Sequence, residues 1–186
     1  MAITIVATAG SATANSYITL SDADDLIDGF VQDEDVVAWA SATDDQKNRA
    51  LYTATQRLDR ERFKGARATD TQALQWPRTG VRKPDTYINT YATGFPFRVT
   101  TDYFTDTEIP DQVQKAEVIL ACYLHNNKEA LNLTGLEAYS RVGVGGVAVI
   151  AYRWGAVWAD NVPPMFQSYL TGLRISGPGN IAIRRS

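Results

Sequence analysis

The chain of 186 residues carries few of the side chains that usually perform catalysis. His125 is its sole histidine and Cys122 its sole cysteine. A single imidazole cannot build a histidine-based metal cluster, and no motif supplies the partner that a nucleophile–histidine dyad needs. His125 ends a helical pattern, where a cation is favoured, and Cys122 falls in the apolar stripe of that pattern. We therefore expect a helix-terminal role for His125, a buried apolar role for Cys122, and no enzymatic activity.

Two acidic runs and one glycine run could bind ligands in principle. The acidic runs, residues 22–25 and 33–35, lack the alternating ligand spacing and central glycine of a calcium loop, and the first falls where a helix dipole favours carboxylates. Residues 143–146 read GVGG, but neither the following Lys-Ser/Thr nor the strand-to-helix context of a phosphate loop is present. We interpret the acidic runs as solvated faces and the glycine run as a hairpin turn. No metal or cofactor is expected.

A basic stretch is the strongest signal for nucleic acid. It holds Arg57, Arg60, Arg62, Lys64, Arg67, Arg78, Arg82 and Lys83, with aromatic residues interleaved. Single-strand binders stack bases on aromatic rings beside a cationic groove. However, Asp59 and Glu61 interrupt the stretch, and the chain as a whole has a net charge of -3. The same cations would serve equally well in salt bridges between identical subunits, so both alternatives stay open.

The composition predicts a single soluble domain. The chain is 45% hydrophobic and 21% charged, which is ordinary for a globular protein, and its length suits one core. Its first residues lack the basic region of a signal peptide, and no apolar run reaches the ~18 residues of a membrane span. We expect a protein made in the cytoplasm, with no membrane partner.

Apolar spacing predicts a mainly α fold, a bundle of about four helices. The helix start signals are Ser21 with Asp24, the capping box of Thr43 with Gln46, Pro110, and the pair Pro163 and Pro164. The second helix is expected to run toward Gly65. Residues 1–6 are predicted as a short strand and 7–15 as a flexible or partner-ordered lead-in. Val36, Val37 and Trp39 are predicted as an apolar knot before the next helix cap.

Two further segments interrupt the bundle. Residues 139–152 alternate around glycines and predict a β-hairpin. Residues 66–108 are rich in Pro, Gly, Thr and aromatic side chains, which predicts a long irregular loop of functional importance. We divide the chain into a helical domain, residues 1–176, and an extended tail, residues 177–186, that begins with a Gly-Pro-Gly hinge.

The aromatic side chains of the long loop outnumber what its own packing needs. They include Tyr87, Tyr91, Phe95, Phe97, Tyr103 and Phe104. Exposed aromatic patches tend to mark interfaces, so we consider these residues, with Val144 and Val147 of the hairpin, a candidate subunit or tail-side interface. The alternative is a satellite core beneath the loop.

One motif is explained by no catalytic chemistry. Residues 72–81 read QALQWPRTGV. Pro77 fixes its own φ and biases Trp76 toward an extended backbone, ahead of a turn at Gly80. The indole is thereby held as a packing or docking element. We consider six residues a structural motif: Gln72, Leu74, Trp76, Pro77, Arg78 and Gly80.

This Gln-x-Leu-x-Trp-Pro-Arg-x-Gly motif, with residues 15–20 (NSYITL) upstream and the late Val162-Pro163-Pro164 helix start, resembles a family of tailed-phage head-tail connector adaptors. The resemblance implies a helical core that displays a hairpin or loop, and a ring of about 12 copies beneath the portal protein. It also implies a virion protein of the neck, made in the host cytoplasm, that contacts the next neck or tail completion protein. Double-stranded DNA would pass through the ring without specific binding.

The tail is the candidate portal contact by this resemblance. Ile181 and Ile183 would lie on one face of an extended segment that adds to a partner's sheet edge or groove, with Arg184 and Arg185 fixing its orientation. A frayed terminus is the alternative. Some members of the same family carry the label of a DnaT-like single-stranded DNA-binding protein, so a replication-type single-strand binder is the alternative function.

Overall fold

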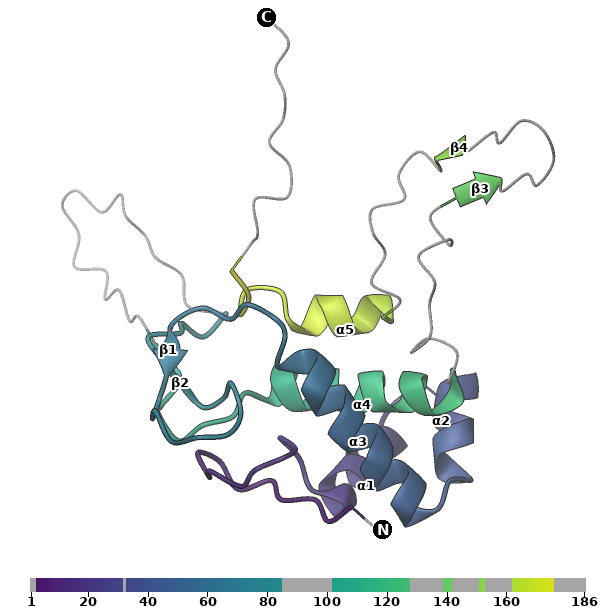
Figure 1. The fold of residues 1–186 in the computed structure, drawn as a ribbon, viewed down its shortest axis with the longest axis horizontal. Helices are drawn as coiled ribbons and strands as arrows, with labels where there is room; N and C mark the ends of the chain where they lie inside the picture. The colour runs from purple at the N-terminus through teal and green to yellow at the C-terminus, as the bar shows by residue number, and fades with distance from the viewer. Residues whose placement is uncertain are drawn as a thin grey trace, which may run out of the picture.

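The computed structural model describes residues 3–31, 33–84, 102–127, 139–141, 151–152 and 162–175. As predicted, the fold is mainly helical, with small two-stranded antiparallel pairs (Figure 1). The helices are α1 (Leu20–Asp28), α2 (Glu34–Ala40), α3 (Asp44–Leu58), α4 (Asp111–Asn126) and α5 (Pro164–Tyr169).

Helix α4 forms the centre of the fold. It packs against α2, α3 and α5, and α1 contacts both α3 and α4. Figure 1 shows α5 lying along one side of α4, with α1 and α2 on the other. A central helix must be apolar on several faces. Val113, Ala116, Leu120 and Leu124 are buried on one face of this helix, Tyr123 is half-buried, and Cys122 is buried as predicted.

The capping box predicted for the longest early helix is confirmed. Thr43 accepts a hydrogen bond from the backbone amide of Gln46, and the Gln46 side chain accepts one from the amide of Thr43. The inward residues Ala50, Leu51 and Ala54 are buried. The helix ends at Leu58, before Gly65, because the chain turns there toward the first strand pair.

Two helix predictions need correction. Helix α1 starts at Leu20 and is capped by Thr19, which accepts from the amide of Asp22, so Ser21 lies inside the helix. The segment predicted as an apolar knot is helix α2, whose cap Asp33 accepts from the amide of Val36. The second acidic run is therefore the cap and first turn of a helix, where its carboxylates oppose the positive dipole end.

The N-terminal segment does not form the predicted strand. Residues 3–6 are not in a strand, and residues 7–15 form turns closed by Asn15. The Asn15 side chain accepts from the amide of Val6 at 2.8 Å and donates to the carbonyl of Thr4 at 2.9 Å. The hydrogen bonds of the Asn15 side chain hold this segment, in place of the backbone hydrogen bonds between paired strands.

Two strand pairs complete the described fold. β1 (Ala66–Arg67) pairs antiparallel with β2 (Arg78–Thr79), so the start of the predicted irregular loop holds regular structure. β3 (Tyr139–Arg141) pairs antiparallel with β4 (Ala151–Tyr152), which agrees with the predicted hairpin; the residues between these two strands, 142–150, lie outside the described part.

Candidate functional site

Five of the six motif residues are buried, and Gly80 is exposed. Trp76 is 1% exposed and packs edge-on against Phe63, with ring centroids 5.6 Å apart, and against Phe104 at 5.9 Å. Leu74 and Pro77 are buried beside it. Of the two roles predicted for the indole, the structure shows packing: a side chain this enclosed cannot stack on a base or dock on a partner without unfolding its surroundings.

The polar members of the motif bond to backbone groups. The Gln72 amide donates to the carbonyls of Leu74 and Pro77, at 2.8 and 3.0 Å, and accepts from the amide of Thr69. Arg78 is 7% exposed. Its guanidinium donates to the carbonyls of Lys64 at 2.7 Å, Gly65 at 2.8 Å and Gln75 at 3.1 Å, and to Gln75 Oε1 at 2.9 Å. These bonds join Arg78 of β2 to the residues that precede β1 and to the connection between the two strands. They also occupy the guanidinium donors that a phosphate would need.

Two glycines give this region its backbone path. Gly65 has φ +70°, and a Cβ there would lie 2.1 Å from the carbonyl oxygen of Thr79. Gly80, the last residue of the motif, has φ +74° but open space around the same position. Gly65 is thus required by both conformation and close approach, and Gly80 by conformation alone.

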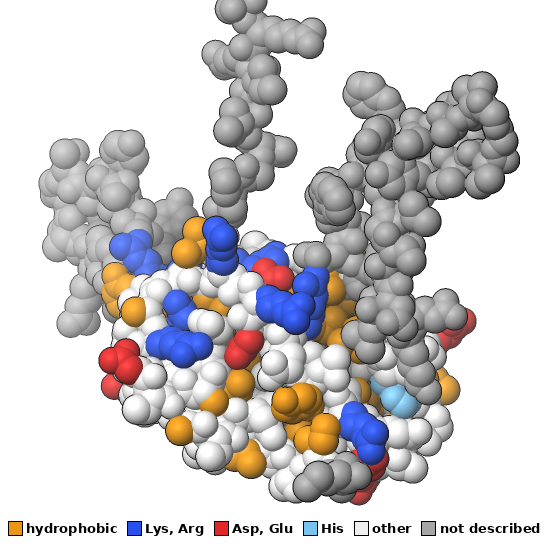
Figure 2. Space-filling model, in the orientation of Figure 1, with side chains coloured by type: hydrophobic (Ala, Val, Ile, Leu, Met, Phe, Trp, Pro, Cys, Tyr) orange, Lys and Arg blue, Asp and Glu red, His pale blue; other side chains and the backbone are white. Residues whose placement is uncertain are grey.

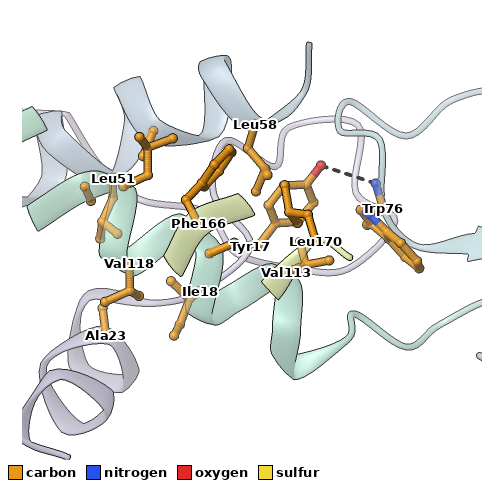
Figure 3. Close-up of a cluster of buried hydrophobic side chains, with 14 of the residues drawn as sticks. Tyr17, Ile18, Ala23, Leu51, Leu58, Trp76, Val113, Val118, Phe166 and Leu170 are labelled. Carbon is orange, nitrogen blue, oxygen red and sulfur yellow. Dashed lines mark hydrogen bonds between the residues drawn. The ribbon is translucent and has the colours of Figure 1, made fainter. Parts of the chain in front are cut away.

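The upstream Ser16-Tyr17 segment is joined to the motif by the Tyr17 hydroxyl. This hydroxyl donates to the carboxylate of Asp59, the C-cap residue of α3, and accepts from the amides of Gln75 at 3.0 Å and Trp76 at 3.3 Å. Figure 3 shows the Tyr17 ring among the core side chains, with its oxygen aimed at Trp76. Burial and the adjacent Asp59 carboxylate raise the pKa of Tyr17, so it stays a neutral donor.

Glu117 is a buried carboxyl that the sequence analysis missed. It accepts from the hydroxyls of Ser16 and Thr55, both at 2.7 Å, and from the amide of Tyr17 at 2.9 Å. Burial raises the pKa of Glu117 to about 7, and these hydrogen bonds oppose that rise. A signal was available: position 117 lies at i+4 from Val113 and inside the apolar stripe of the helix.

Exposed cations gather near the motif. We define the basic end as Arg60, Arg62, Lys64 and Arg67, all exposed and none in an ion pair with another residue of the described ranges. In Figure 2 most of the Lys and Arg side chains visible on this face lie over its left and upper part. Lys83 pairs with Glu108 and Arg82 lies against Tyr103, so these two predicted cations are partly engaged.

A groove lies at the other end of the molecule. It has a cavity volume of about 490 Å³ and runs between the α1–α2 connection, α4 and the start of α5. Its lining is mostly apolar, with Val31 85% exposed and Met165 52% exposed at its edge. Two carboxylates, Asp33 and Asp35, are the charged side chains that line it. We call it the apolar groove.

The structure separates the two candidate interface residues that it describes. Tyr103 is 41% exposed, whereas Phe104 is buried against Trp76, so the satellite-core alternative holds for Phe104. The remaining interface candidates lie outside the described residues: Tyr87, Tyr91, Phe95, Phe97, Val144 and Val147. The four predicted portal-contact residues also lie outside them: Ile181, Ile183, Arg184 and Arg185.

His125 lies in the last turn of α4, as predicted, edge-on to Trp39 with ring centroids 6.4 Å apart. Among the described residues, no cluster of three or more His, Cys, Asp or Glu is placed to hold a metal ion. No helix in this part of the chain has the length and apolar character needed to cross a bilayer.

Comparison with known proteins gives one family. A family model described as "Putative DnaT-like ssDNA binding protein" matches residues 1–186. No curated protein and no solved structure matches the chain.

Proposed function

The chain belongs to this DnaT-like family over its whole length; from the resemblance of its motif to head-tail connector adaptors, and from the burial of that motif in the core, we propose that it is a structural adaptor of a phage neck. In this proposal, copies of the chain form a ring on the portal protein. The ring lengthens the DNA channel and joins the head to the tail.

The observation that carries the proposal is the enclosure of the Trp-Pro-Arg motif. Trp76 and Arg78, a ring for stacking and a cation for phosphate, are the two motif residues that a single-strand binder would present to DNA. Here the indole is surrounded by core side chains and the guanidinium donates to backbone carbonyls. The motif therefore stabilises the fold from within, and a structural adaptor needs such a stable fold.

The charge of the chain supports the same proposal. A channel that passes DNA must not hold it, and a net charge of -3 gives no overall attraction for phosphate. Residues 177–186 would contact the portal, and another face would meet the next neck or tail completion protein. The proposed location is the neck of the virion, after synthesis in the host cytoplasm.

The experiment is co-sedimentation with the portal protein encoded in the same genome. The full-length chain is compared with a chain that ends at Ser176. We expect only the full-length chain to travel with portal rings. If both do, the adaptor role stands and the tail contact is wrong; if neither does, the adaptor proposal fails.

A second function, single-stranded DNA binding, is favoured by one observation. The basic end holds four exposed cations within residues 60–67, and the family description names this ligand. The test is titration of a fluorescent oligonucleotide at low salt with Arg60→Glu/Arg62→Glu, against Arg49→Glu as a distant control. Binding that only the first variant weakens would support this function. Arg78→Glu is unsuitable, since it would break the core.

A further inference from the structure

The charges of this chain are sorted between two ends of the fold. Residues 20–50 hold nine Asp and Glu against two Lys and Arg, whereas residues 57–83 hold eight Lys and Arg against three Asp and Glu. The first range forms α1, α2 and the start of α3, and the second ends in the β1–β2 pair. Figure 1 shows α2 and the β1–β2 pair at opposite ends of the long axis.

Ion pairs among the described residues engage part of this charge. Lys47 pairs with Asp24 at 3.0 Å and Arg49 with Asp45 at 2.8 Å, both within the acidic range. In the basic range, Glu61 pairs with Arg174 at 2.9 Å and Lys83 with Glu108 at 3.2 Å, and Arg78 is buried. The four cations of the basic end are exposed, as is Asp33 at the opposite end. Opposite excesses on one surface attract a second copy in a head-to-tail orientation.

Each end also carries an exposed apolar feature. At the acidic end, the apolar groove is bordered by Asp33 and Asp35. At the basic end, Ile175 is an apolar side chain that is 53% exposed, and its backbone amide donates to the carbonyl of Arg62 at 2.8 Å. We call Ile175 the apolar knob, and this backbone bond places it next to Arg62 in the fold. An apolar groove with a carboxylate border is the complementary surface for it.

We infer that the apolar groove of one copy receives the basic end of a second copy, with Ile175 in the groove and the cations around Arg62 facing Asp33 and Asp35. The two surfaces differ, so the contact is heterologous, and repetition of such a contact generates a ring when the rotation closes. This inference rests on the proposed ring and names the surfaces that build it.

The test uses two variants that each remove one side of the contact. The groove variant, Val31→Lys/Met165→Lys, places cations in the groove; both side chains are exposed, so the fold is preserved. The knob variant, Arg62→Glu/Ile175→Glu, places carboxylates on the basic end. Matched controls are Val37→Lys, at an exposed valine of α2 that does not line the groove, and Arg49→Glu, at an exposed arginine of α3.

Sedimentation velocity at low salt measures the assembly. We expect the wild type and both controls to associate with rising concentration, and each variant alone to stay monomeric. An equimolar mixture of the two variants still has one intact groove and one intact knob, so it should form a dimer and nothing larger. Raised salt should weaken that dimer.

Two results would overturn the inference: a mixture that stays monomeric up to about 1 mM, the range of weak specific contacts, or a variant that associates alone as the wild type does. The outcome is separable from the adaptor role. If the chain binds portal rings while the mixture stays monomeric, the adaptor role is supported and the inferred contact surfaces are wrong. If the mixture dimerises but the chain does not bind the portal, the contact surfaces are supported and the adaptor role is wrong.

Discussion

The carboxyl of Glu117 accepts a 2.9 Å hydrogen bond from the backbone amide of Tyr17, which lies 100 residues earlier in the chain. The bond joins the N-terminal segment to the central helix α4. The hydroxyl of Tyr17 then reaches Asp59 and the Trp76 amide. One residue thus connects α4, the end of α3 and the Trp-Pro-Arg motif, and the first predictions concern this connection.

Glu117→Gln should remove a pH dependence of stability. The folded state raises the pKa of Glu117 from 4.5 to about 7, so between these pH values the folded chain binds a proton that the unfolded chain does not. The free energy of unfolding should therefore fall as pH rises from 4.5 to 7, by up to about 3 kcal/mol.

The Gln variant should lack this component. Its amide can accept from the Tyr17 amide and donate to the hydroxyl oxygens of Ser16 and Thr55, whose own hydrogens can turn to the carbonyls of Ile18 and Leu51. Urea unfolding at several pH values measures the effect, with the exposed Glu34→Gln as control. A Gln variant whose stability follows pH as the wild type does would contradict the assignment.

Tyr17→Phe should lower the free energy of unfolding by about 1 to 3 kcal/mol. The change leaves the ring in place but removes the hydrogen bonds to Asp59 and to the amides of Gln75 and Trp76. Tyr52→Phe is the control, because Tyr52 is partly exposed on α3. Equal urea midpoints for the two variants would show that the hydroxyl contributes nothing.

Arg78→Lys should cost about 2 kcal/mol or more although it keeps the charge. A lysine cannot reproduce the fork that reaches the carbonyls of Lys64, Gly65 and Gln75 at once. Arg60→Lys, at an exposed position, should change stability by no more than about 0.5 kcal/mol. Thermal unfolding of both variants measures the difference. An Arg78→Lys protein as stable as the wild type would show that the Arg78 hydrogen bonds do not stabilise the fold.

Gly65→Ala and Gly80→Ala should differ in cost. Both positions have positive φ, so alanine costs about 1 to 2 kcal/mol at each. At Gly65 the added Cβ would also meet the Thr79 carbonyl at 2.1 Å, which must force β1 and β2 apart. We expect Gly65→Ala to unfold at clearly lower urea than Gly80→Ala. Similar midpoints would mean that the close approach is not present in solution.

The sequence predicted those elements whose signals are local. The capping box of Thr43 and Gln46 needs only two residues in one turn, and it was confirmed. Ser21 and Thr19 both carry a hydroxyl that can cap a helix, so the sequence alone does not decide between them. The start of α1 was therefore placed at Ser21, two residues after the true cap, Thr19. Helix α2 was missed because seven residues are too short for a clear apolar period, although Asp33 is a good cap.

The parts that depend on distant residues could not be predicted. Pro77 indicated that Trp76 is held rigidly, but the choice between packing and docking depends on Phe63 and Phe104, far away in the chain. Glu117 was overlooked because a charged residue type was assumed to face solvent. Its partners Ser16 and Thr55 are brought together only by the tertiary fold.

The most direct test of the adaptor role is electron cryomicroscopy of portal rings incubated with the full-length chain, reconstructed without imposed symmetry. The account predicts a second ring of helical density on the portal, with the portal channel continuing through it. The α1–α2 end of each copy should face the β1–β2 end of the next. Portal rings without added density, at a concentration where the chain coats single-stranded DNA, would contradict the account and favour the DNA-binding function.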